Sequence, residues 1–394
     1  EWLAREGSAM GAAPTCASIP RRPLIAGGSG LIGSNLLTLL AHTGRCELIR
    51  VLDMRPPMSQ VLAGLAVKVE FVCFCLGVDS REKLLETFDG VDCVFSVVTP
   101  HVQLATTEQF EMTNHIGVQT MAQACVECGV PRLVHLSSTA ATGQYFESVD
   151  MAESQALPPL ESYESPYDIT KRLGEEAVLR AARGSSLSAC CIRSCGIWLS
   201  PWDFCWGNMW PVVPGLIAQP RGERMDFIDG RDVCRALVLA GQALELRPQE
   251  VSGEVFSVTR GEAFTPDEVG AYAARLLGYP FIRLPSLVVR AVQLVSCSQY
   301  HIRSRLGLRV PGIKPHRFIA MLFFRQTFDN GKALRLLGFA PKVDMKSSMA
   351  RIVAQWLKHT GATTGLRPLR SFLASVSLVS LAIARLLLLA IRRR

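Results

Sequence analysis

A glycine-rich turn close to the N-terminus constrains this chain more than any other feature. A short apolar run ends at Ala26, and a helical pattern begins a few residues later. Gly27 and Gly30 lie between them, and Gly33 follows in the first turn of the helical pattern. A Cβ atom at these positions would block the tight turn and keep a phosphate group away from the helix N-terminus. The turn therefore predicts a strand, turn and helix that together bind a nucleotide.

The second strand of this unit ends on a carboxylate, Asp53. A carboxylate at this point accepts hydrogen bonds from both ribose hydroxyls of an adenosine and repels a 2′-phosphate, which favours NAD. Arg55 softens that discrimination, so NADP remains an alternative. The expected cofactor-binding residues are Gly27, Gly30, Leu31, Ile32, Gly33 and Asp53, joined by Tyr167 and Lys171 further along the chain.

Apolar strand patterns alternate with helical patterns after the turn. Strands are expected at Glu47 to Asp53, Val67 to Phe74, Asp92 to Val98 and Arg132 to Leu136, and helices at Leu31 to Ala41, Ser80 to Phe88 and Thr106 to Gly129. This alternation predicts a doubly wound α/β fold of the Rossmann type, with helices on both faces of a parallel sheet. Asn114 falls inside a helix, where it either holds an irregular backbone or faces solvent.

Three polar residues follow in the order that a hydride-transfer site requires. Ser138 ends a buried strand, and Tyr167 and Lys171 lie four residues apart, on one face of the next helix. A phenol has a reference pKa of about 10, and a neighbouring ammonium group favours its ionised form. A serine hydroxyl beside the phenol can hold the substrate oxygen.

These residues together resemble the extended short-chain dehydrogenase/reductase family, and within it the 3β-hydroxysteroid dehydrogenase branch. The resemblance runs from about Arg22 to Lys358, and its specific segments are residues 26–33, 89–95, 137–138, 227–233 and 328–341 with Tyr167 and Lys171. It implies that Ser138 orients the substrate, that Tyr167 accepts the proton, and that Lys171 lowers the pKa of Tyr167 and holds the nicotinamide ribose. It also implies a structural role for Asp232, which would couple the sheet to a smaller lobe.

The chain departs from the family pattern in two loops. Cys75 and Leu76 stand where the family often has Gly-Asp, so the grip on adenine is expected to be weaker. Ser194 replaces a proline, and Leu199 falls where the family has a glycine, so the loop on the nicotinamide side is expected to have another shape.

The second half of the chain is rich in apolar and aromatic residues. Trp202, Trp206 and Trp210 recur every four residues, as in packed helices and in walls for a flat apolar ligand. Pro280 to Ser296 is expected to be a buried or interfacial helix. Phe372 to Ile391 contains one charged residue in twenty and is expected to be a membrane anchor.

The length and composition of the chain predict its division into domains and exclude some partners. The 394 residues are expected to divide into a disordered lead-in (1–21), a Rossmann domain (22–200), a substrate lobe with interleaved sheet elements (201–361) and a C-terminal apolar anchor helix (371–391). The net charge of +8 is largely explained by the arginines at the termini, which argues against a nucleic-acid partner. No metal site is expected.

The resemblance implies NAD-dependent oxidation of the 3β-hydroxyl of a sterol or steroid, with loss of CO2 if the substrate carries a 4-carboxyl group. A dehydrogenase/isomerase, a nucleotide-sugar epimerase and a non-catalytic nucleotide-binding protein are the alternatives. Further expectations are a membrane partner, a location at the endoplasmic reticulum with the catalytic domain in the cytosol, and a homodimer as an open question.

Overall fold

The computed structural model describes residues 18–76, 78–200, 216–361 and 364. The strands are β1 Pro23–Ala26, β2 Leu48–Asp53, β3 Lys68–Cys73, β4 Cys93–Ser96, β5 Arg132–Ser138, β6 Ser148–Met151, β7 Ser188–Ser194, β8 Gly196–Trp198, β9 Ile217–Pro220, β10 Met225–Asp229, β11 Val255–Val258, β12 Ala263–Phe264, β13 Phe281–Leu284 and β14 Gln326–Phe328. The helices are α1 Leu31–His42, α2 Ser59–Leu62, α3 Arg81–Phe88, α4 Thr107–Phe110, the π-helix η2 Glu111–Gly117, α5 Val118–Glu127, the 3₁₀ turns η3 Thr139–Thr142 and η4 Leu160–Ser162, α6 Pro166–Ala182, α8 Gly230–Leu246, α9 Pro248–Val251, α10 Pro266–Leu277, α11 Ser286–Arg305, α12 Pro315–Met321, α13 Gly331–Leu337 and α14 Met345–Thr360.

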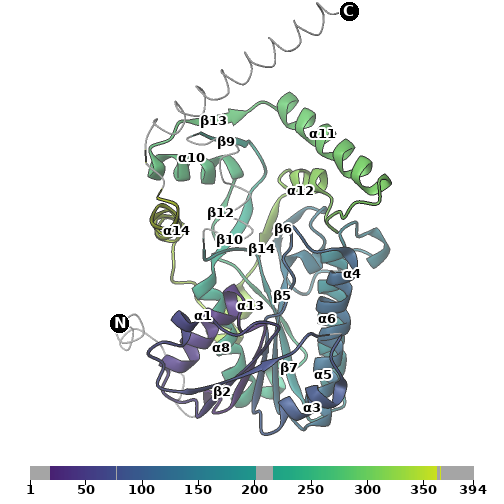
Figure 1. Cartoon of the computed structure of the whole chain (residues 1–394), viewed down its shortest axis with the longest axis vertical. Coiled ribbons are helices and arrows are strands. Elements are labelled where there is room, and N and C mark those ends of the chain that lie inside the picture. The colour runs from purple at the N-terminus through teal and green to yellow at the C-terminus, as the bar shows by residue number, and fades with distance from the viewer. Residues whose placement is uncertain (1–17, 77, 201–215, 362–363, 365–394) are drawn as a thin grey trace, which may run out of the picture.

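A parallel sheet forms the centre of the larger lobe (Figure 1). In the described part of the chain it has seven strands in the order β11-β7-β5-β4-β1-β2-β3. The chain order reverses between β1 and β4, and in sheets of this kind the crevice at such a reversal is where ligands bind. The doubly wound Rossmann-type fold expected from the alternating patterns is confirmed.

Helices cover both faces of this sheet and bury a separate apolar core on each. One core joins α1 and α8 to the sheet and includes Leu37, Phe95 and Leu237. The other joins α3 and α5 to the opposite face and includes Phe88 and Met121. A strand with both faces covered is largely apolar, which explains the apolar runs of β1, of Cys93–Phe95 in β4 and of Ala189–Ile192 in β7.

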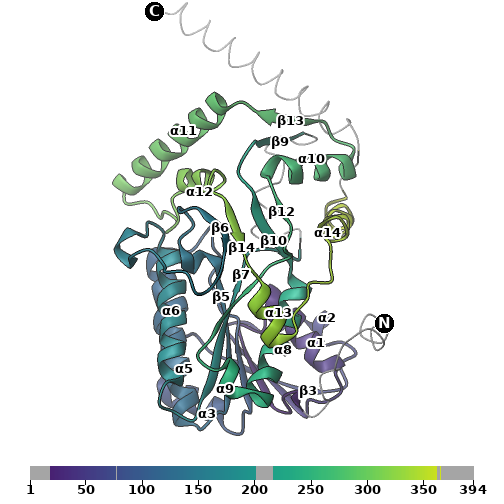
Figure 2. The ribbon, with the colours of Figure 1, turned by 180° about the vertical axis from the view of Figure 1, so that it is seen from behind.

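A smaller lobe is built from the second sheet, β12-β10-β14-β6 with β8 beside β10, and from the pair β13 and β9. Helices α10 and α14 pack on it, and α11 and α12 complete it above the central sheet (Figure 2). The two lobes exchange elements, because β6 of the smaller lobe comes from the first half of the chain and β11 of the central sheet comes from the second.

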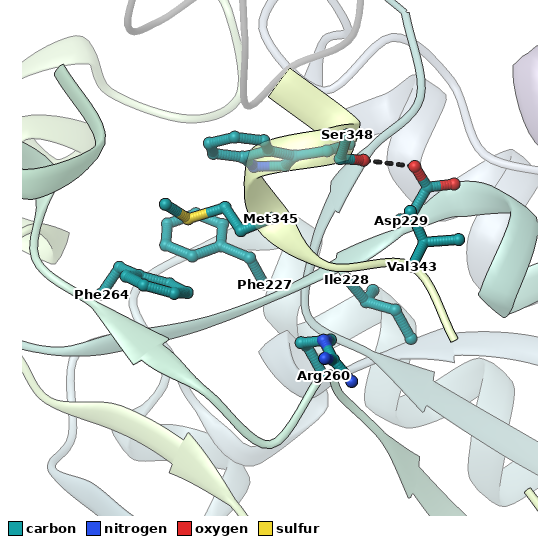
Figure 3. Close-up of a pocket in the computed structure, with 9 residues that line it drawn as sticks. Phe227, Ile228, Asp229, Arg260, Phe264, Val343, Met345 and Ser348 are labelled. Atoms are coloured by element: carbon teal, nitrogen blue, oxygen red, sulfur yellow. Dashed lines mark hydrogen bonds between the residues drawn. The ribbon is translucent and has the colours of Figure 1, made fainter. Parts of the chain in front are cut away.

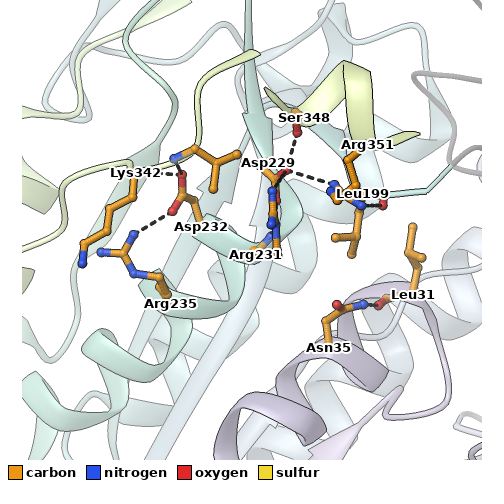
Figure 4. A network of polar contacts seen from close by, with 11 residues as sticks. Leu31, Asn35, Leu199, Asp229, Arg231, Asp232, Arg235, Lys342, Ser348 and Arg351 are labelled. Carbon is orange, nitrogen blue, oxygen red and sulfur yellow. Dashed lines mark hydrogen bonds and ion pairs between the residues drawn. The ribbon is translucent and has the colours of Figure 1, made fainter. Parts of the chain in front are cut away.

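A polar network ties the two lobes together at the N-terminus of α8 (Figure 4). The buried carboxylate of Asp229 accepts hydrogen bonds from Arg231, from Ser348 and from Arg351, the last at 3.0 Å. Asp232 accepts bonds from Arg235 at 2.7 Å and from the backbone N–H groups of residues 342 and 343 at 2.9 Å each. These contacts agree with the structural role expected for Asp232.

A π-helix interrupts the long helix that was expected at Thr106 to Gly129. Asn114 lies at its centre, is fully buried, and donates to the Thr170 hydroxyl at 3.4 Å. Helix α6 approaches this turn so closely that a Cβ atom on Gly174 would lie 2.2 Å from the Asn114 carbonyl oxygen. Of the two interpretations of Asn114, the structure therefore supports an irregular backbone in a packed interface.

Two expectations need correction. Residues 18–21 belong to the folded domain rather than to a disordered lead-in, because the buried Ser18 accepts a bond from Arg132 and the Arg21 N–H donates to Asp92. Pro280 to Ser296 is not one helix. Its first part is β13, which pairs with β9. Helix α11 begins only after Pro285, because the residue that precedes a proline is biased toward extended backbone.

Other expectations fall on residues outside the described ranges. These are the tryptophans at 202, 206 and 210 and the anchor at 371–391, so both stay predictions. Within the described ranges, no helix is both long and apolar enough to cross a membrane.

A buried ion pair fastens α6 to the central sheet. Arg193 of β7 donates to the Glu175 carboxylate through Nε at 3.0 Å and through a second guanidinium nitrogen. Both side chains are almost completely enclosed, with 6% and 4% of their surface exposed. Removing one partner would leave the other charge buried without compensation.

We therefore expect Glu175→Ala to lower the free energy of unfolding by about 3–5 kcal/mol. Urea denaturation checks this value. The double variant Glu175→Leu/Arg193→Met removes both charges and should recover most of the loss. Equal destabilisation of the single and the double variant would contradict the proposed cause.

Candidate functional site

The glycine turn joins β1 to α1 at the reversal of strand order. Gly27 has φ +84°, and a Cβ atom there would lie 3.0 Å from the Val98 amide nitrogen at the end of β4. A Cβ atom on Gly33 would lie 2.1 Å from the Gly27 carbonyl oxygen, and one on Gly30 would lie 3.2 Å from it. The three glycines therefore allow the helix to begin directly against the strand.

The first turn of α1 is open to an anion. Gly30 is its N-cap residue, no side chain caps the helix, and no acidic residue occurs in the first turn. Leu31 and Ile32 are the first two helical residues, so their N–H groups belong to the unpaired N-terminal set. Such groups, with the positive end of the helix dipole, bind phosphate. The turn fits the pyrophosphate of a dinucleotide.

Asp53 lies beside this turn at the end of β2. Its carboxylate accepts bonds from the Ser29 N–H at 3.0 Å and the Arg55 N–H at 3.3 Å. The half-buried carboxylate is thereby fixed next to the glycine turn, with acceptor capacity left for ribose hydroxyls. This is where the sequence placed the adenosine contact.

The loop after β3 has an apolar character. Leu76 is buried, and it packs so closely on the π-helix that a Cβ atom on Gly117 would lie 2.9 Å from the Leu76 Cβ. The neighbouring Cys75 N–H donates to the Asp79 carboxylate at 3.0 Å. The weaker grip on adenine stays a prediction, and Leu76 serves packing.

Ser138 ends β5 in an extended conformation and caps the 3₁₀ turn η3. Its Oγ accepts a bond from the Ala140 N–H at 3.1 Å. Because a hydroxyl carries one donor and two acceptor positions, this contact leaves the O–H free to donate to a ligand oxygen. The side chain is half-buried, as a group lining a crevice would be.

Tyr167 and Lys171 project from the first turns of α6. The Lys171 ammonium is buried and donates to the carbonyl oxygens of Leu136 at 3.1 Å and Val98 at 3.5 Å, at the ends of β5 and β4. Burial lowers the pKa of Lys171 to about 8. The half-buried Tyr167 ring packs edge-on against Phe110, with the ring centroids 5.6 Å apart. Lys171 thus reaches the strand that ends at Ser138.

Two residues that sequence reasoning missed hold this arrangement together. The fully buried Asp168 carboxylate accepts a bond from the Gln144 N–H at 2.9 Å. The Tyr163 hydroxyl donates to the Ala141 carbonyl oxygen at 2.9 Å. Both bonds tie the segment after Ser138 to the start of α6. The position of Asp168 next to Tyr167 was the one available signal.

A small apolar pocket lies in the other lobe, between β10 and α14 (Figure 3). It is lined by Trp198, Phe227, Ile228, Asp229, Arg260, Phe264, Val343, Met345 and Ser348. Its volume of about 10 Å³ has room for roughly one water molecule. This pocket is a packing defect of the lobe and does not fit a substrate.

The fold and the site are those of a dinucleotide-binding α/β protein of the short-chain dehydrogenase/reductase type. A family model described as "3-beta hydroxysteroid dehydrogenase/isomerase family" matches residues 24–265. The chain belongs to this family, and the resemblance found in the sequence is confirmed.

Curated relatives cover most of the chain. It is 25% identical over 355 residues to 3beta-hydroxysteroid-dehydrogenase/decarboxylase isoform 1 of Arabidopsis thaliana, covering 84% of this chain and 78% of the relative. It is 26% identical over 358 residues to human sterol-4-alpha-carboxylate 3-dehydrogenase, decarboxylating, covering 86% and 89%. These similarities identify an oxidoreductase.

Solved structures share the fold. The structure described as MoeE5 in complex with UDP-glucuronic acid and NAD has a TM-score of 0.64 at 21% identity, covering 86% of this chain and 99% of the other. DesIV, a dTDP-glucose 4,6-dehydratase from Streptomyces venezuelae with NAD and TYD bound, has a TM-score of 0.65 at 21% identity, covering 86% and 98%. Both of those structures contain NAD, and their likeness to this chain concerns the fold.

Gly33→Ala should weaken NAD binding, because its Cβ atom must push the glycine turn away from α1. Overpacking typically costs about 1–3 kcal/mol, which corresponds to roughly a 5- to 150-fold loss of affinity. Isothermal titration calorimetry checks this value. Asn35→Ala, one turn along the same helix where the side chain only bonds the Leu31 carbonyl oxygen, should bind NAD like the wild type. Wild-type affinity in Gly33→Ala would contradict the role of the close contact.

Asp168→Asn should change how stability depends on pH. Burial raises the pKa of Asp168 to about 7, whereas an unfolded aspartate titrates near 4. The ionised carboxyl therefore destabilises the fold increasingly as pH rises from about 4 to 7, and asparagine keeps an acceptor without this penalty. The free energy of unfolding of Asp168→Asn should rise relative to wild type across this range, by at most about 4 kcal/mol.

Urea denaturation at several pH values measures this difference. Asp89→Asn, at an exposed position, is the matched control and should show no such rise. A difference between Asp168→Asn and wild type that stays constant from pH 4 to 7 would contradict the prediction.

Proposed function

We propose that this protein is an NAD-dependent dehydrogenase that oxidises the 3β-hydroxyl of a sterol carrying a 4-carboxyl group, with loss of CO2. The observation that carries the proposal is the placement of Ser138, Tyr167 and Lys171. The three residues lie where the ends of β4 and β5 meet the start of α6, beside the reversal of strand order that holds the glycine turn.

The cofactor part of the proposal rests on the turn itself. Gly27, Gly30 and Gly33 leave a space that a Cβ atom would fill, and Asp53 lies where it can accept the adenosine ribose hydroxyls. NAD, when bound, supplies the acceptor for the hydride that leaves C3 of the substrate. An acidic residue at the end of β2 favours NAD over NADP, although Arg55 is two residues away.

Three side chains act in the transfer of the proton from the substrate 3-hydroxyl group. Tyr167, as phenolate, removes the proton from the 3-hydroxyl group. The buried ammonium of Lys171 favours that phenolate, and at neutral pH it remains mostly protonated because its pKa is about 8. The free O–H of Ser138 donates a hydrogen bond to the substrate oxygen and holds it beside the phenol.

Decarboxylation requires little further machinery in this proposal. Oxidation at C3 of a 4-carboxysterol gives a β-keto acid, and the new carbonyl group accepts the electron pair that the departing CO2 leaves behind. The 4-carboxysterol is chosen because the Arabidopsis and human relatives carry the terms decarboxylase and decarboxylating in their names.

Two enzymatic alternatives have less support. An isomerase needs a further acid or base, and Asp168, the buried carboxyl beside Tyr167, is enclosed and bonded to Gln144. A nucleotide-sugar epimerase fits the solved neighbours, whose likeness concerns the fold alone. A non-catalytic nucleotide-binding protein is the remaining alternative, and the assay below decides it.

Location and assembly belong to the proposal as well. We infer a membrane-associated enzyme at the endoplasmic reticulum with a cytosolic catalytic domain, anchored by residues 371–391. The composition of that segment and the apolar substrate support this inference. Formation of a homodimer is left to experiment.

Detergent-solubilised protein should reduce NAD⁺ and release CO2 when it is given a 4-carboxy-3β-hydroxysterol. Tyr167→Phe should lower the turnover number by roughly 10²- to 10⁴-fold, because it removes the proton acceptor but keeps the ring. Absorbance at the NADH band and trapped CO2 are the two measurements.

Tyr272→Phe, at a half-buried position packed against the apolar core of the smaller lobe, is the matched control and should keep wild-type turnover. Calorimetry should show that Tyr167→Phe still binds NAD. Wild-type protein that binds NAD but forms no NADH from this sterol would sink the proposal.

A further inference from the structure

Helix α12 of the smaller lobe lies at the boundary between the two lobes (Figure 1). Its Phe318 side chain and the Tyr167 ring pack against the same small apolar cluster around Phe110. The neighbouring Arg317 forms an ion pair with Glu164, which lies three residues before Tyr167 in the sequence. These two contacts place the Arg317 guanidinium group at the start of α6, beside the proposed proton acceptor.

Tyr145 connects Arg317 to the segment that follows Ser138. The central carbon of the guanidinium group lies 5.3 Å from the centroid of the Tyr145 ring. The preceding residue, Gln144, donates its N–H to the Asp168 carboxylate in the first turn of α6 at 2.9 Å. Arg317 therefore contacts both segments that carry the proposed catalytic hydroxyl groups.

The charge of Arg317 is available to a ligand. The ion pair with Glu164 is loosely held, because the two side chains are 36% and 48% exposed. Exposed ion pairs of this kind contribute little to stability. A guanidinium group also carries several N–H donors, so it can bind a second carboxylate beside Glu164 or exchange one for the other.

Arg317 also borders open space. Together with Arg290 and His316, it lines a hollow of about 380 Å³ between α11 and α12. Sites for small molecules usually have volumes of about 300–1,000 Å³. The hollow therefore has room for part of a ligand, and basic groups line it.

Three other cations around α6 have fixed partners. The Lys171 ammonium group bonds carbonyl oxygens at the ends of β4 and β5. Arg172 bonds the Glu176 carboxylate at 3.0 Å, and the buried Arg193 is paired with the next glutamate back along α6. Compared with these three, Arg317 is the cation that is best able to meet a new anion.

We propose that Arg317 binds the 4-carboxylate of the substrate and selects acidic sterols over neutral ones. This inference rests on the proposed function, in which the carboxyl group is attached to the carbon next to the one that bears the 3-hydroxyl. When Tyr167 meets the hydroxyl, the carboxylate lies close by in the same crevice. A carboxylate taken out of water without a cation is strongly disfavoured.

Arginine suits this role because its planar group bonds both oxygens of a carboxylate at once. It favours the ionised carboxyl group and therefore acts on binding and on the oxidation step. The loss of CO2 follows hydride transfer, when the β-keto acid has formed.

Steady-state kinetics with the detergent-solubilised full-length protein test the proposal. The substrate is a 4-carboxy-3β-hydroxysterol, and the competitor is the neutral sterol that carries a 4-methyl group instead. Arg317→Gln should raise the KM for the acid by about 10- to 100-fold, because it removes a charged hydrogen bond. The turnover number should change much less, since the carboxylate is bound alike before and during hydride transfer. The inhibition constant of the neutral sterol should stay close to that of the wild type.

Three further variants separate charge from packing. Arg317→Lys keeps the charge without the planar group and should recover part of the loss. Glu164→Gln removes the competing carboxylate and should lower the KM for the acid. Arg275→Gln, at an exposed position of α10, is the matched control and should keep the wild-type KM. A Tm equal to that of the wild type checks that each variant is folded.

The outcomes distinguish this inference from the proposed function. Wild-type protein that binds NAD but forms no NADH from the acid would remove the proposed function and this inference with it. If the wild type oxidises the acid and Arg317→Gln has the same KM, the proposed function stands and the inference is wrong. An equal loss of affinity for the acid and for the neutral sterol would also overturn the inference, because it would assign Arg317 to packing.

Discussion

The candidate site depends on how helix α6 packs against the carboxyl edge of the central sheet. One face of this helix carries the Lys171 ammonium that bonds the ends of β4 and β5, and Glu175 that pairs with Arg193 of β7. Gly174 allows α6 to pack closely on the π-helix η2 at Asn114. Since Tyr167 lies on the same helix, its position relative to Ser138 is set by these contacts, all of which form across long stretches of sequence.

The glycine turn and the placement of Ser138 and Lys171 at the ends of β5 and α6 could be predicted because their signals are local, whereas the catalytic roles of Ser138, Tyr167 and Lys171 stay predictions. Gly27 has a positive φ and Gly33 makes a close backbone contact. Each requirement can be recognised in the sequence, because it selects glycine at that position. The periodicity of the apolar residues likewise predicted the parallel sheet and its covering helices. The family resemblance then supplied roles that spacing alone could not assign.

Long-range contacts account for what the sequence did not reveal. Nothing near Asp168 indicates that its carboxylate reaches Gln144, and nothing near Arg193 indicates its pairing with Glu175. The strand β13 was missed because its pairing with β9 depends on residues more than 60 positions away. Leu76 was interpreted only as a lost polar contact, whereas the structure uses it to pack the π-helix.

The exchange of strands between the two lobes has a consequence for how the chain folds during synthesis. The central sheet is incomplete until β11, at Val255–Val258, has left the ribosome, and β6 waits for β14, at Gln326–Phe328, to find its partner. The central sheet can therefore be completed before the sheet of the smaller lobe, even though β6 of the smaller lobe is made earlier than β7 and β11. The nascent chain must hold β6 without its strand partner until residue 328 of 394 has been made.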